Sequence, residues 1–472
     1  MTGKQLISKI ASPGAGEVFA ELYGADEVET ARQRYTKLVE GMKDRGFSET
    51  GRDAPTIFDE RELRVFSAPG RTELGGNHTD HNCGKVLAAS VQLDKAAIVW
   101  ERPDKTIFFR SDGHRDVSVC LADSAAMQAR QEEQGKTEAL IRGIAAELHR
   151  RGTSAGGFSA NAHSTVMPGS GLSSSAAVEV LLGKIFDCLY GDGTRSAPEL
   201  ARIGQIAEND FFGKPCGLMD QIACASGGAV AINFAQAPDA PAPSPDTQLP
   251  GDGPQIQCIN FNPAAVGYVL CVVNTAGSHA NLTPEYTAIP AEMKAVAAFF
   301  GKGVLAELNR EAVLSAAADV RKAAGDRALL RAIHFFDEND RVDGMALALK
   351  DMDKAACTDA KHSTFRRFME LVNESGDSSW QLLQNIYPPA AESHTADKQG
   401  ISVALALSKE FFRRHKIEGA CRVHGGGFAG TIQAYIPLDA LTAYRQYIEA
   451  VFGANSLTAL RIRPLGAVEL EL

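Results

Sequence analysis

The chain has 472 residues, which is long for one hydrophobic core and predicts two domains. Acidic residues outnumber basic ones by 58 to 48, giving a net charge of −10. No Lys- or Arg-rich block offsets this charge, so the composition argues against a nucleic-acid-binding protein. No apolar run approaches the roughly 20 residues that span a bilayer, so we expect no membrane segment.

The nine cysteines are scattered along the chain, and none forms a CxxC pair. Their number is odd, which does not fit a framework of disulfides. Together with an N-terminus that lacks a signal-type pattern, they predict reduced thiols in a cytoplasmic protein.

The first half of the chain alternates between helical and strand-like patterns. Apolar residues recur at helical spacing over residues 26–43 and again over 137–151. Short apolar runs separated by Gly, Pro and Asn predict strands and turns over 64–100. Residues 158–166 alternate as a strand does, and a helical pattern follows over 173–189. This last pair predicts the order strand, Gly/Ser loop, helix.

The second half begins after a change in composition near residue 225, which we take as the domain boundary. A Pro- and Asp-rich stretch at 237–254 predicts a surface insertion. Residues 267–274 predict a buried strand, and 418–436 predict two strands around a Gly-rich turn. Residues 439–452 predict a helix.

The loop at residues 168–180 (PGSGLSSSAAVEV) joins the predicted strand to the predicted helix. A loop that enters a helix presents unpaired N–H groups and the positive end of the helix dipole, and its glycines let an anion approach closely. Three serines add hydroxyls for phosphate oxygens or Mg²⁺. The segment predicts a nucleotide phosphate site; it is not a Walker A loop, because no G-x-x-x-x-G-K-[ST] occurs. The alternative is a flexible turn that only caps the helix.

A dense polar cluster lies at residues 68–87 (APGRTELGGNHTDHNCGKVL). So many hydrogen-bonding side chains on a tight turn suit a polyhydroxylated ligand. Two alternatives stay open, a metal site and an Asx-rich structural turn without a ligand. The metal site would use His78, Asp80, His81 and Cys83.

An acidic candidate occurs in residues 207–221 (AENDFFGKPCGLMDQ). Asp220, in apolar surroundings and beside a cation such as Arg71, could stay ionised and accept or orient a hydroxyl proton. Glu208 could reach Mg²⁺ bound to nucleotide phosphates. The alternative is that Asp220 only caps a helix.

A third glycine-rich segment, residues 424–430 (HGGGFAG), separates the two strands predicted over 418–436. Three consecutive glycines predict positive φ or a very close approach of the backbone. The alternative is a tight hairpin without a functional role.

Together these segments resemble galactokinase, within the GHMP small-molecule kinase family. Residues 68–87 are similar to the family's P-G-R-x-N-x-I-G-E-H-T-D-Y. Residues 167–176 are similar to P-x-G-x-G-L-S-S-S-A with Met167 at the first position, and 425–430 to G-G-G-F-G-G with Ala429 at one Gly. Residues 207–221 resemble A-E-N-x-x-x-G-x-P-C-G-x-M-D-Q. The segment NTAGSHANLTPEY, which ends at Tyr286, resembles a later sugar-side segment.

The resemblance implies an α+β fold of two domains, 1–225 and 226–472, with mixed sheets, helices and an active site in the interdomain cleft. It implies that MgATP phosphorylates the anomeric hydroxyl of galactose to give galactose 1-phosphate. The implied ligands are therefore a sugar, ATP and Mg²⁺, with no nucleic acid and no membrane. We expect a monomer or a weak homo-oligomer.

Carried over by position, the resemblance makes Asp220 the catalytic carboxylate and Arg71 its partner. The residues expected to bind the sugar are Glu73, Asn77, His78, Asp80 and Tyr286. Those expected around the ATP phosphates are Gly169, Ser170, Gly171, Leu172, Ser173, Ser174 and Ser175. Ser175 and Glu208 are expected at Mg²⁺.

The sugar motif departs from the family pattern. Asn77 stands where galactokinases carry a sugar-contacting Glu, and Glu73 stands where they carry Asn. We hypothesise that this exchange of acid and amide is compensatory. His424 replaces a small residue before the triple glycine. The alternatives for function are therefore an anomeric kinase for L-arabinose, galacturonate or an N-acetylhexosamine, and a sugar sensor without catalysis.

Overall fold

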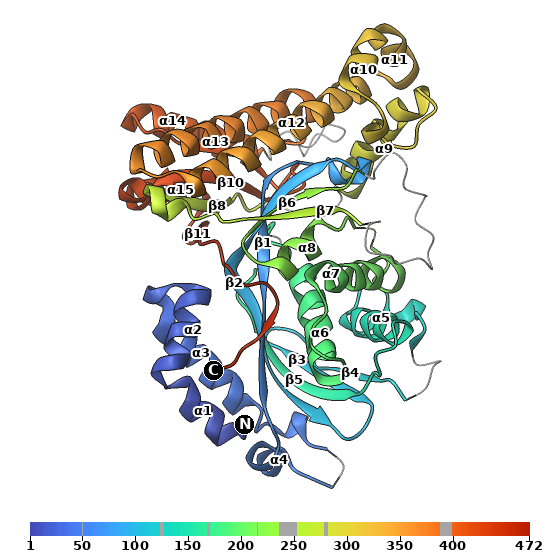
Figure 1. The fold of residues 1–472 in the computed structure, drawn as a ribbon, viewed down its shortest axis with the longest axis vertical. Helices are drawn as coiled ribbons and strands as arrows, with labels where there is room; N and C mark the ends of the chain where they lie inside the picture. Colours follow the sequence, from blue (N-terminus) through green and yellow to red (C-terminus); the bar gives the residue numbers. More distant parts are fainter. Residues whose placement is uncertain are drawn as a thin grey trace.

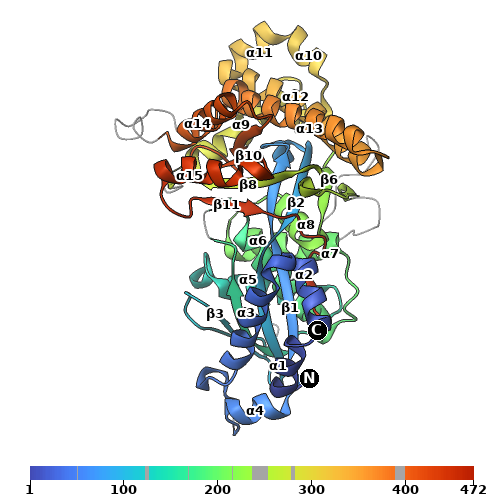
Figure 2. The same ribbon diagram turned by 90° about the vertical axis from the view of Figure 1, so that its left-hand side faces the viewer.

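The computed structural model describes residues 1–49, 51–122, 127–167, 170–214, 216–235, 253–277, 282–387 and 399–472. Two sheets lie one above the other along the long axis of the molecule (Figures 1 and 2). The two ends of the chain lie close together at the lower part of the molecule. Within the described residues no helix has the length and apolar character of a membrane span.

The larger sheet has eight strands in the order β12-β1-β2-β5-β3-β4, and β6 pairs with both β2 and β7. The pairing of β3 with β5 is parallel and the other pairings are antiparallel, so the sheet is mixed. Its strands are β1 (Arg64–Gly75), β2 (Lys85–Arg102), β3 (Thr106–Ser111), β4 (Val117–Cys120), β5 (Gly157–Ser164), β6 (Ala229–Asn233), β7 (Gln255–Ile259) and β12 (Val468–Glu469).

Helices cover both faces of this sheet, as Figure 1 shows on either side of β1 and β2. Strand β2 explains why: Ala97 and Val99 join the core beneath α5 and α6, whereas Ala96, Ile98 and Trp100 point to the N-terminal helices. Successive side chains of a strand point to opposite faces, so a strand that is apolar throughout needs a cover on each side. The N-terminal helices are α1 (Gly3–Ile10), α2 (Pro13–Tyr23), α3 (Val28–Gly41) and α4 (Ala54–Glu60). The other face carries α5 (Thr137–Arg150), α6 (Ser174–Tyr190), α7 (Ala197–Ile206) and α8 (Met219–Ser226).

The second sheet is antiparallel, with the order β11-β8-β10-β9. Leu270 and Val272 of β8 face the core shared with α12 and α13, whereas Val269, Cys271 and Val273 face α14 and α15. The strands are β8 (Tyr268–Asn274), β9 (Ala420–His424), β10 (Thr431–Pro437) and β11 (Leu457–Leu460). The helices are α12 (Asp326–Lys354), α13 (Thr358–Ser378), α14 (Gly400–His415) and α15 (Leu441–Phe452).

Three further helices form a lobe with the first part of α12, at the upper right of Figure 1. They are α9 (Thr283–Phe299), α10 (Arg310–Ser315) and α11 (Ala317–Ala324). Two π-helical segments, η6 (Ala207–Phe212) and η9 (Ser379–Leu383), continue α7 and α13. Such segments occur often at functional sites.

The structure confirms the predicted order of strand, loop and helix as β5 followed by α6. It also confirms the helices predicted over 26–43 and 137–151 as α3 and α5. Most of the predicted insertion at 237–254, namely residues 237–252, lies outside the described residues. The boundary near residue 225 stays a proposal; β6 and β7, which follow it, are hydrogen-bonded to the larger sheet.

Candidate active site

Arg71 on β1 and Asp220 in the first turn of α8 form a two-point ion pair. Arg71 Nε donates to Asp220 Oδ1 over 2.7 Å, and Nη2 donates to Oδ2 over 2.8 Å. Arg71 is buried, whereas 32% of the Asp220 side chain is exposed. Burial raises the pKa of Asp220, but the charge and hydrogen bonds of Arg71 outweigh it and hold the pKa below its usual range. The alternative that Asp220 only caps a helix is wrong, since its carboxylate accepts from Arg71 and Ser173.

The Gly/Ser loop is tied to this pair. The Arg71 side chain donates to the carbonyl of Gly171, and its backbone N–H donates to that of Leu172 over 3.0 Å. Ser173 has a left-handed φ of 55°, and its hydroxyl donates to Asp220 Oδ2 instead of capping α6. The N-terminal N–H groups of this helix, which starts at Ser174, therefore lack a side-chain cap from Ser173 and can receive an anion beside Asp220.

The other residues predicted to hold phosphate lie on either side of Ser173 along the chain. Ser170 is buried, and its hydroxyl donates to the carbonyl of Met167 over 2.6 Å. Ser175 lies in the first turn of α6, half-buried. Gly169 lies outside the described residues.

Two buried carboxylates, Glu208 and Glu179, meet at Gln221, the residue that follows Asp220. Glu208 on η6 is buried and accepts hydrogen bonds from Lys214 Nζ at 2.9 Å and from Gln221 Nε2 at 3.1 Å. The same Gln221 amide donates to Glu179 Oε2 over 2.9 Å. Burial, and then the charge of Glu208, raise the pKa of Glu179 well above its ordinary value. Ser175 lies one helical turn before Glu179 on the same face of α6, so these contacts bring Ser175 and Glu208 to one region.

The sugar motif meets the triple glycine at its backbone carbonyls. Asn77 Nδ2 donates to Gly425 O over 2.7 Å, and His78 Nε2 lies 2.9 Å from Gly426 O. Tyr286 Oη donates to Gly427 O over 2.9 Å. The predicted positive φ is confirmed at Gly425, with +69°, and at Gly427, with +82°. The triple glycine therefore forms the turn of a β9–β10 hairpin, which was the alternative interpretation of this segment. The same turn also accepts contacts from the polar cluster at residues 68–87.

Glu73 and Asn77 are partners of each other and of more distant residues. Asn77 Nδ2 donates to Glu73 Oε1 over 3.0 Å, and Asn77 Oδ1 accepts from Asn385 Nδ2 over 2.7 Å. Glu73 also pairs with the guanidinium of Arg422. Glu73 is 3% and Asn77 1% exposed, so the structure surrounds both side chains with protein groups.

His78 and Asp80 occupy the same turn with more room. Both are partly exposed, and burial lowers the pKa of His78 to about 3, so its ring is neutral and donates through Nε2 to Gly426. A methyl group on Gly217 would overlap with the Asp80 carboxylate, which places Asp80 against the loop that leads to Asp220. Among the described residues, no group of three or more His, Cys, Asp or Glu side chains could hold a metal ion.

His424, to which the sequence assigned no role, joins the two sheets at the site. Its Nε2 lies 3.0 Å from Thr72 Oγ1 on β1, and its Nδ1 lies 3.0 Å from Thr431 Oγ1 on β10. Burial lowers its pKa to about 3, so the ring is neutral beside Arg71. The sequence offered one indication of a role for His424: it stands directly before the triple glycine, where the family carries a small residue.

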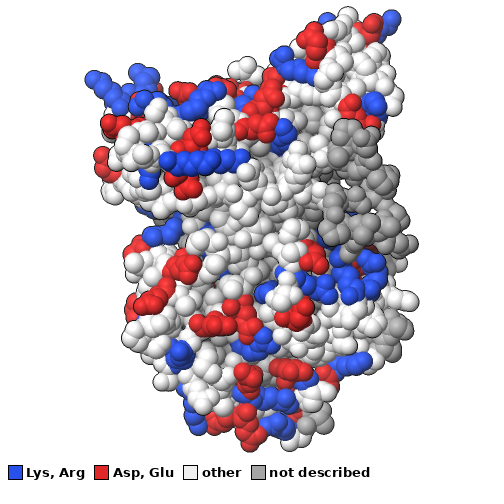
Figure 3. All heavy atoms as spheres, in the orientation of Figure 1, with Lys and Arg blue, Asp and Glu red and all other residues white. Residues whose placement is uncertain are grey.

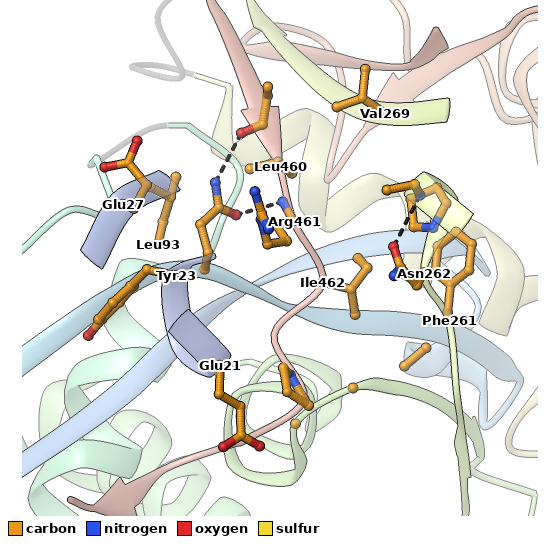
Figure 4. Close-up of a pocket in the computed structure, with 18 of the residues that line it drawn as sticks. Glu21, Tyr23, Glu27, Leu93, Phe261, Asn262, Val269, Leu460, Arg461 and Ile462 are labelled. Atoms are coloured by element: carbon orange, nitrogen blue, oxygen red, sulfur yellow. Dashed lines mark hydrogen bonds between the residues drawn. The ribbon is translucent and has the colours of Figure 1, made fainter. Parts of the chain in front are cut away.

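A cavity of about 1210 Å³ lies between the N-terminal helices and the second sheet. Figure 4 shows Tyr23 and Glu27 on one side of it, Phe261 and Val269 on the other, and Leu460 and Arg461 between them. It contains none of the predicted site residues. In the view of Figure 3, acidic and basic residues are interspersed over most of this face of the molecule.

Comparisons with known proteins show which family this chain is similar to. Residues 139–228 match the family described as GHMP kinases N terminal domain, and residues 56–100 match the galactokinase galactose-binding signature. A galactokinase of Glaesserella parasuis serovar 5 (strain SH0165) is 28% identical over 401 residues, which cover 83% of this chain and 90% of that protein.

Two solved structures share the fold. Lactococcus lactis galactokinase complexed with galactose aligns with a TM-score of 0.68 at 23% identity, covering 88% of this chain and 97% of that chain. Methanococcus jannaschii mevalonate kinase aligns with a TM-score of 0.54 at 12% identity, covering 85% and 98%. The two-sheet α+β arrangement is therefore the one that these kinases share.

Proposed function

We propose that this chain, which belongs to the GHMP kinase family, transfers the terminal phosphoryl group of ATP to the anomeric hydroxyl of galactose. The observation that carries the proposal is the contact of Asp220 with both Arg71 and Ser173. It joins a carboxylate able to hold a sugar hydroxyl to the loop able to hold the phosphate. The galactose-binding signature over residues 56–100 supports galactose as the acceptor.

In the proposed reaction Asp220 receives the anomeric hydroxyl. The hydroxyl oxygen forms a bond to the γ-phosphorus, the bond between that phosphorus and the bridging oxygen breaks, and ADP leaves. Because Arg71 holds the pKa of Asp220 low, the carboxylate is a weak base. We therefore propose that it mainly orients the hydroxyl and accepts the proton late, and that catalysis rests on positioning and charge stabilisation.

The phosphates would lie against the loop from Gly169 to Ser175, at the N-terminus of α6. Two observations support this assignment. Helix α6 is seventeen residues long, so it has a full helix dipole, and the Ser173 hydroxyl donates to Asp220 and does not cap the helix. The N–H groups of the first helical turn and the dipole of the helix then serve the nucleotide.

Ser175 and Glu208 would hold Mg²⁺ together with phosphate oxygens, which is the coordination that this ion favours. The donor set fits a cation, because the buried Oε1 atoms of Glu179 and Gln221, close to Glu208, find no hydrogen-bond partner within the described part of the chain. Bound Mg²⁺ would neutralise charge on the phosphates as it develops.

His78, Asp80 and Tyr286 would contact the sugar, because their side chains lie near the triple-glycine turn and are partly exposed, so that a ligand can reach them. Glu73 and Asn77 are both buried, so they would influence sugar binding indirectly, by fixing where the triple-glycine turn lies. The comparisons do not favour the alternative sugars or the non-catalytic sensor.

All nine cysteines are free thiols, which supports the expected cytoplasmic location.

The decisive experiment is product identification. Incubation with galactose and MgATP should yield a phosphorus NMR signal for galactose 1-phosphate, and an Asp220→Asn variant should yield almost none. Phosphate on another carbon, or equal turnover without sugar, would refute the proposal.

A further inference from the structure

Lys214 is bent back onto Glu208 by the turn that ends η6. The backbone N–H groups of Gly213 and Lys214 both donate to the carbonyl of Glu208, over 3.0 and 3.1 Å. Gly213 has a φ of +84°, which this reversal requires. The Lys214 ammonium then reaches Glu208 Oε1 over 2.9 Å.

The two ends of this ion pair differ in their surroundings. The side chain of Glu208 is 4% exposed, whereas that of Lys214 is 60% exposed. A buried carboxylate without a positive partner costs several kcal/mol, so Glu208 depends on a cation. The long, flexible lysine can leave that position without unpacking the core.

The neighbourhood of Lys214 is strongly acidic. The Lys214 ammonium contacts Glu208, and Gln221 joins Glu208 to the buried carboxyl of Glu179. The charge of Lys214 in turn acts on the carboxyls of Glu179 and Asp220. Arg71 is engaged by Asp220 and Gly171, so Lys214 is the cation that contacts Glu208 among the described residues.

We propose, on the basis of the proposed function, that Lys214 is a positioning residue that holds Glu208 until the metal–nucleotide binds and then moves onto the ATP phosphates. The metal and the ammonium compete for one carboxylate oxygen, so they cannot both occupy it. Released from Glu208, the ammonium would be free to bind phosphate charge, and lysine binds phosphate as a point charge.

The test uses three variants of the full chain: Lys214→Met, Lys214→Arg and, as a matched control, Lys409→Met. Lys409 forms a comparable 2.8 Å pair with Asp377, but this pair is half-exposed and lies on α13 and α14. The first measurement is Mn²⁺ binding to nucleotide-free enzyme, followed by electron paramagnetic resonance. Lys214→Met should bind Mn²⁺ roughly tenfold more tightly, because the competing ammonium is gone, whereas Lys214→Arg and Lys409→Met should match the unchanged protein.

The second measurement is the KM for MgATP, which should rise roughly tenfold in Lys214→Met for the loss of a charged hydrogen bond and be largely restored in Lys214→Arg. Unchanged Mn²⁺ affinity, or an unchanged KM, would overturn the proposal. Failure of the proposed function is seen separately, as an absence of sugar phosphorylation in the unchanged protein.

Discussion

Glu73 accepts a 3.0 Å hydrogen bond from Asn77, so the two residues at which the sugar motif exchanges acid and amide are direct partners. The other side-chain contacts of this pair are with Arg422 on β9, with the carbonyl of Gly425 after β9, and with Asn385 after η9. One buried network therefore spans both sheets beneath the sugar motif, as the hypothesis of a compensatory exchange requires.

Asn77→Glu should destabilise the protein and change its sugar preference. The new carboxylate would lie beside that of Glu73 in a site that is 1% exposed, and Gly425 O would lose its donor. We expect the free energy of unfolding to fall by about 3–5 kcal/mol, measured by urea denaturation.

The double variant Glu73→Asn/Asn77→Glu is the control. If the exchange is compensatory, its effect should be smaller than the sum of the two single effects by at least about 1 kcal/mol. Additive effects, or an Asn77→Glu variant with unchanged sugar preference, would argue against the hypothesis.

Asp220→Asn should abolish most of the turnover while galactose binding persists. The amide keeps the shape of the side chain but cannot accept a proton or balance the buried charge of Arg71. We expect kcat to fall by about 10²–10⁴-fold, with little change in galactose affinity by calorimetry. Asp377→Asn, which breaks the half-exposed pair with Lys409, should leave kcat unchanged. A similar kcat for both variants would exclude a catalytic role for Asp220.

The sequence predicted the elements whose apolar residues form one regular pattern. Helix α3 buries one stripe of side chains, whereas α5 and α6 are buried on more than one face. The sequence of residues 158–166, which includes most of β5, alternates between apolar and polar residues. The 29-residue helix α12 was not predicted, because its buried face includes Arg331, His334 and Glu338, which interrupt the apolar spacing. These polar residues bind groups that are remote in sequence, such as the carbonyl of Asn77, so their pattern has no local explanation.

In the candidate site, too, features carried by a local sequence pattern could be predicted, whereas features that depend on remote residues could not. Asp220 and Arg71 could be named from motifs, and the structure brings them together. The burial of Asn77 could not be named, because it depends on Asn385, 308 residues further along the chain.

Glu338 should make stability dependent on pH at the acid end. It is fully buried and accepts from Gly76 N at 3.0 Å, Ser375 Oγ at 2.7 Å and Arg341 Nε at 2.7 Å. Burial raises its pKa, but Arg341, His334 and Arg422 outweigh it and lower the pKa from 4.5 to about 2. The folded pKa lies below the unfolded one, so the stabilisation is complete above about pH 4.5 and is lost as the pH falls toward 2.

The check is the free energy of unfolding of the unchanged protein and of Glu338→Gln between pH 7 and pH 2.5. The advantage of the unchanged protein should be constant above about pH 4.5 and shrink below it. A difference that does not depend on pH would show that the charge of Glu338 does not stabilise the fold.

Gly171→Ala should weaken ATP binding through the contact between the phosphate loop and His424. Gly171 has a φ of +73°, and an added Cβ would lie 2.8 Å from His424 Nδ1 and 2.9 Å from Thr431 Oγ1.

The Gly113→Ala variant is the control that separates backbone strain from overpacking. Gly113 has a φ of +78°, but an added Cβ there would meet no atom of the described residues within 4 Å. Gly113→Ala should cost only the backbone strain, about 1 kcal/mol. Gly171→Ala should cost about 1–3 kcal/mol more for overpacking and should also raise the KM for MgATP, because the displaced carbonyl of Gly171 is the one that Arg71 holds. Equal stability losses, with an unchanged KM in both variants, would mean that the loop adjusts without moving Arg71.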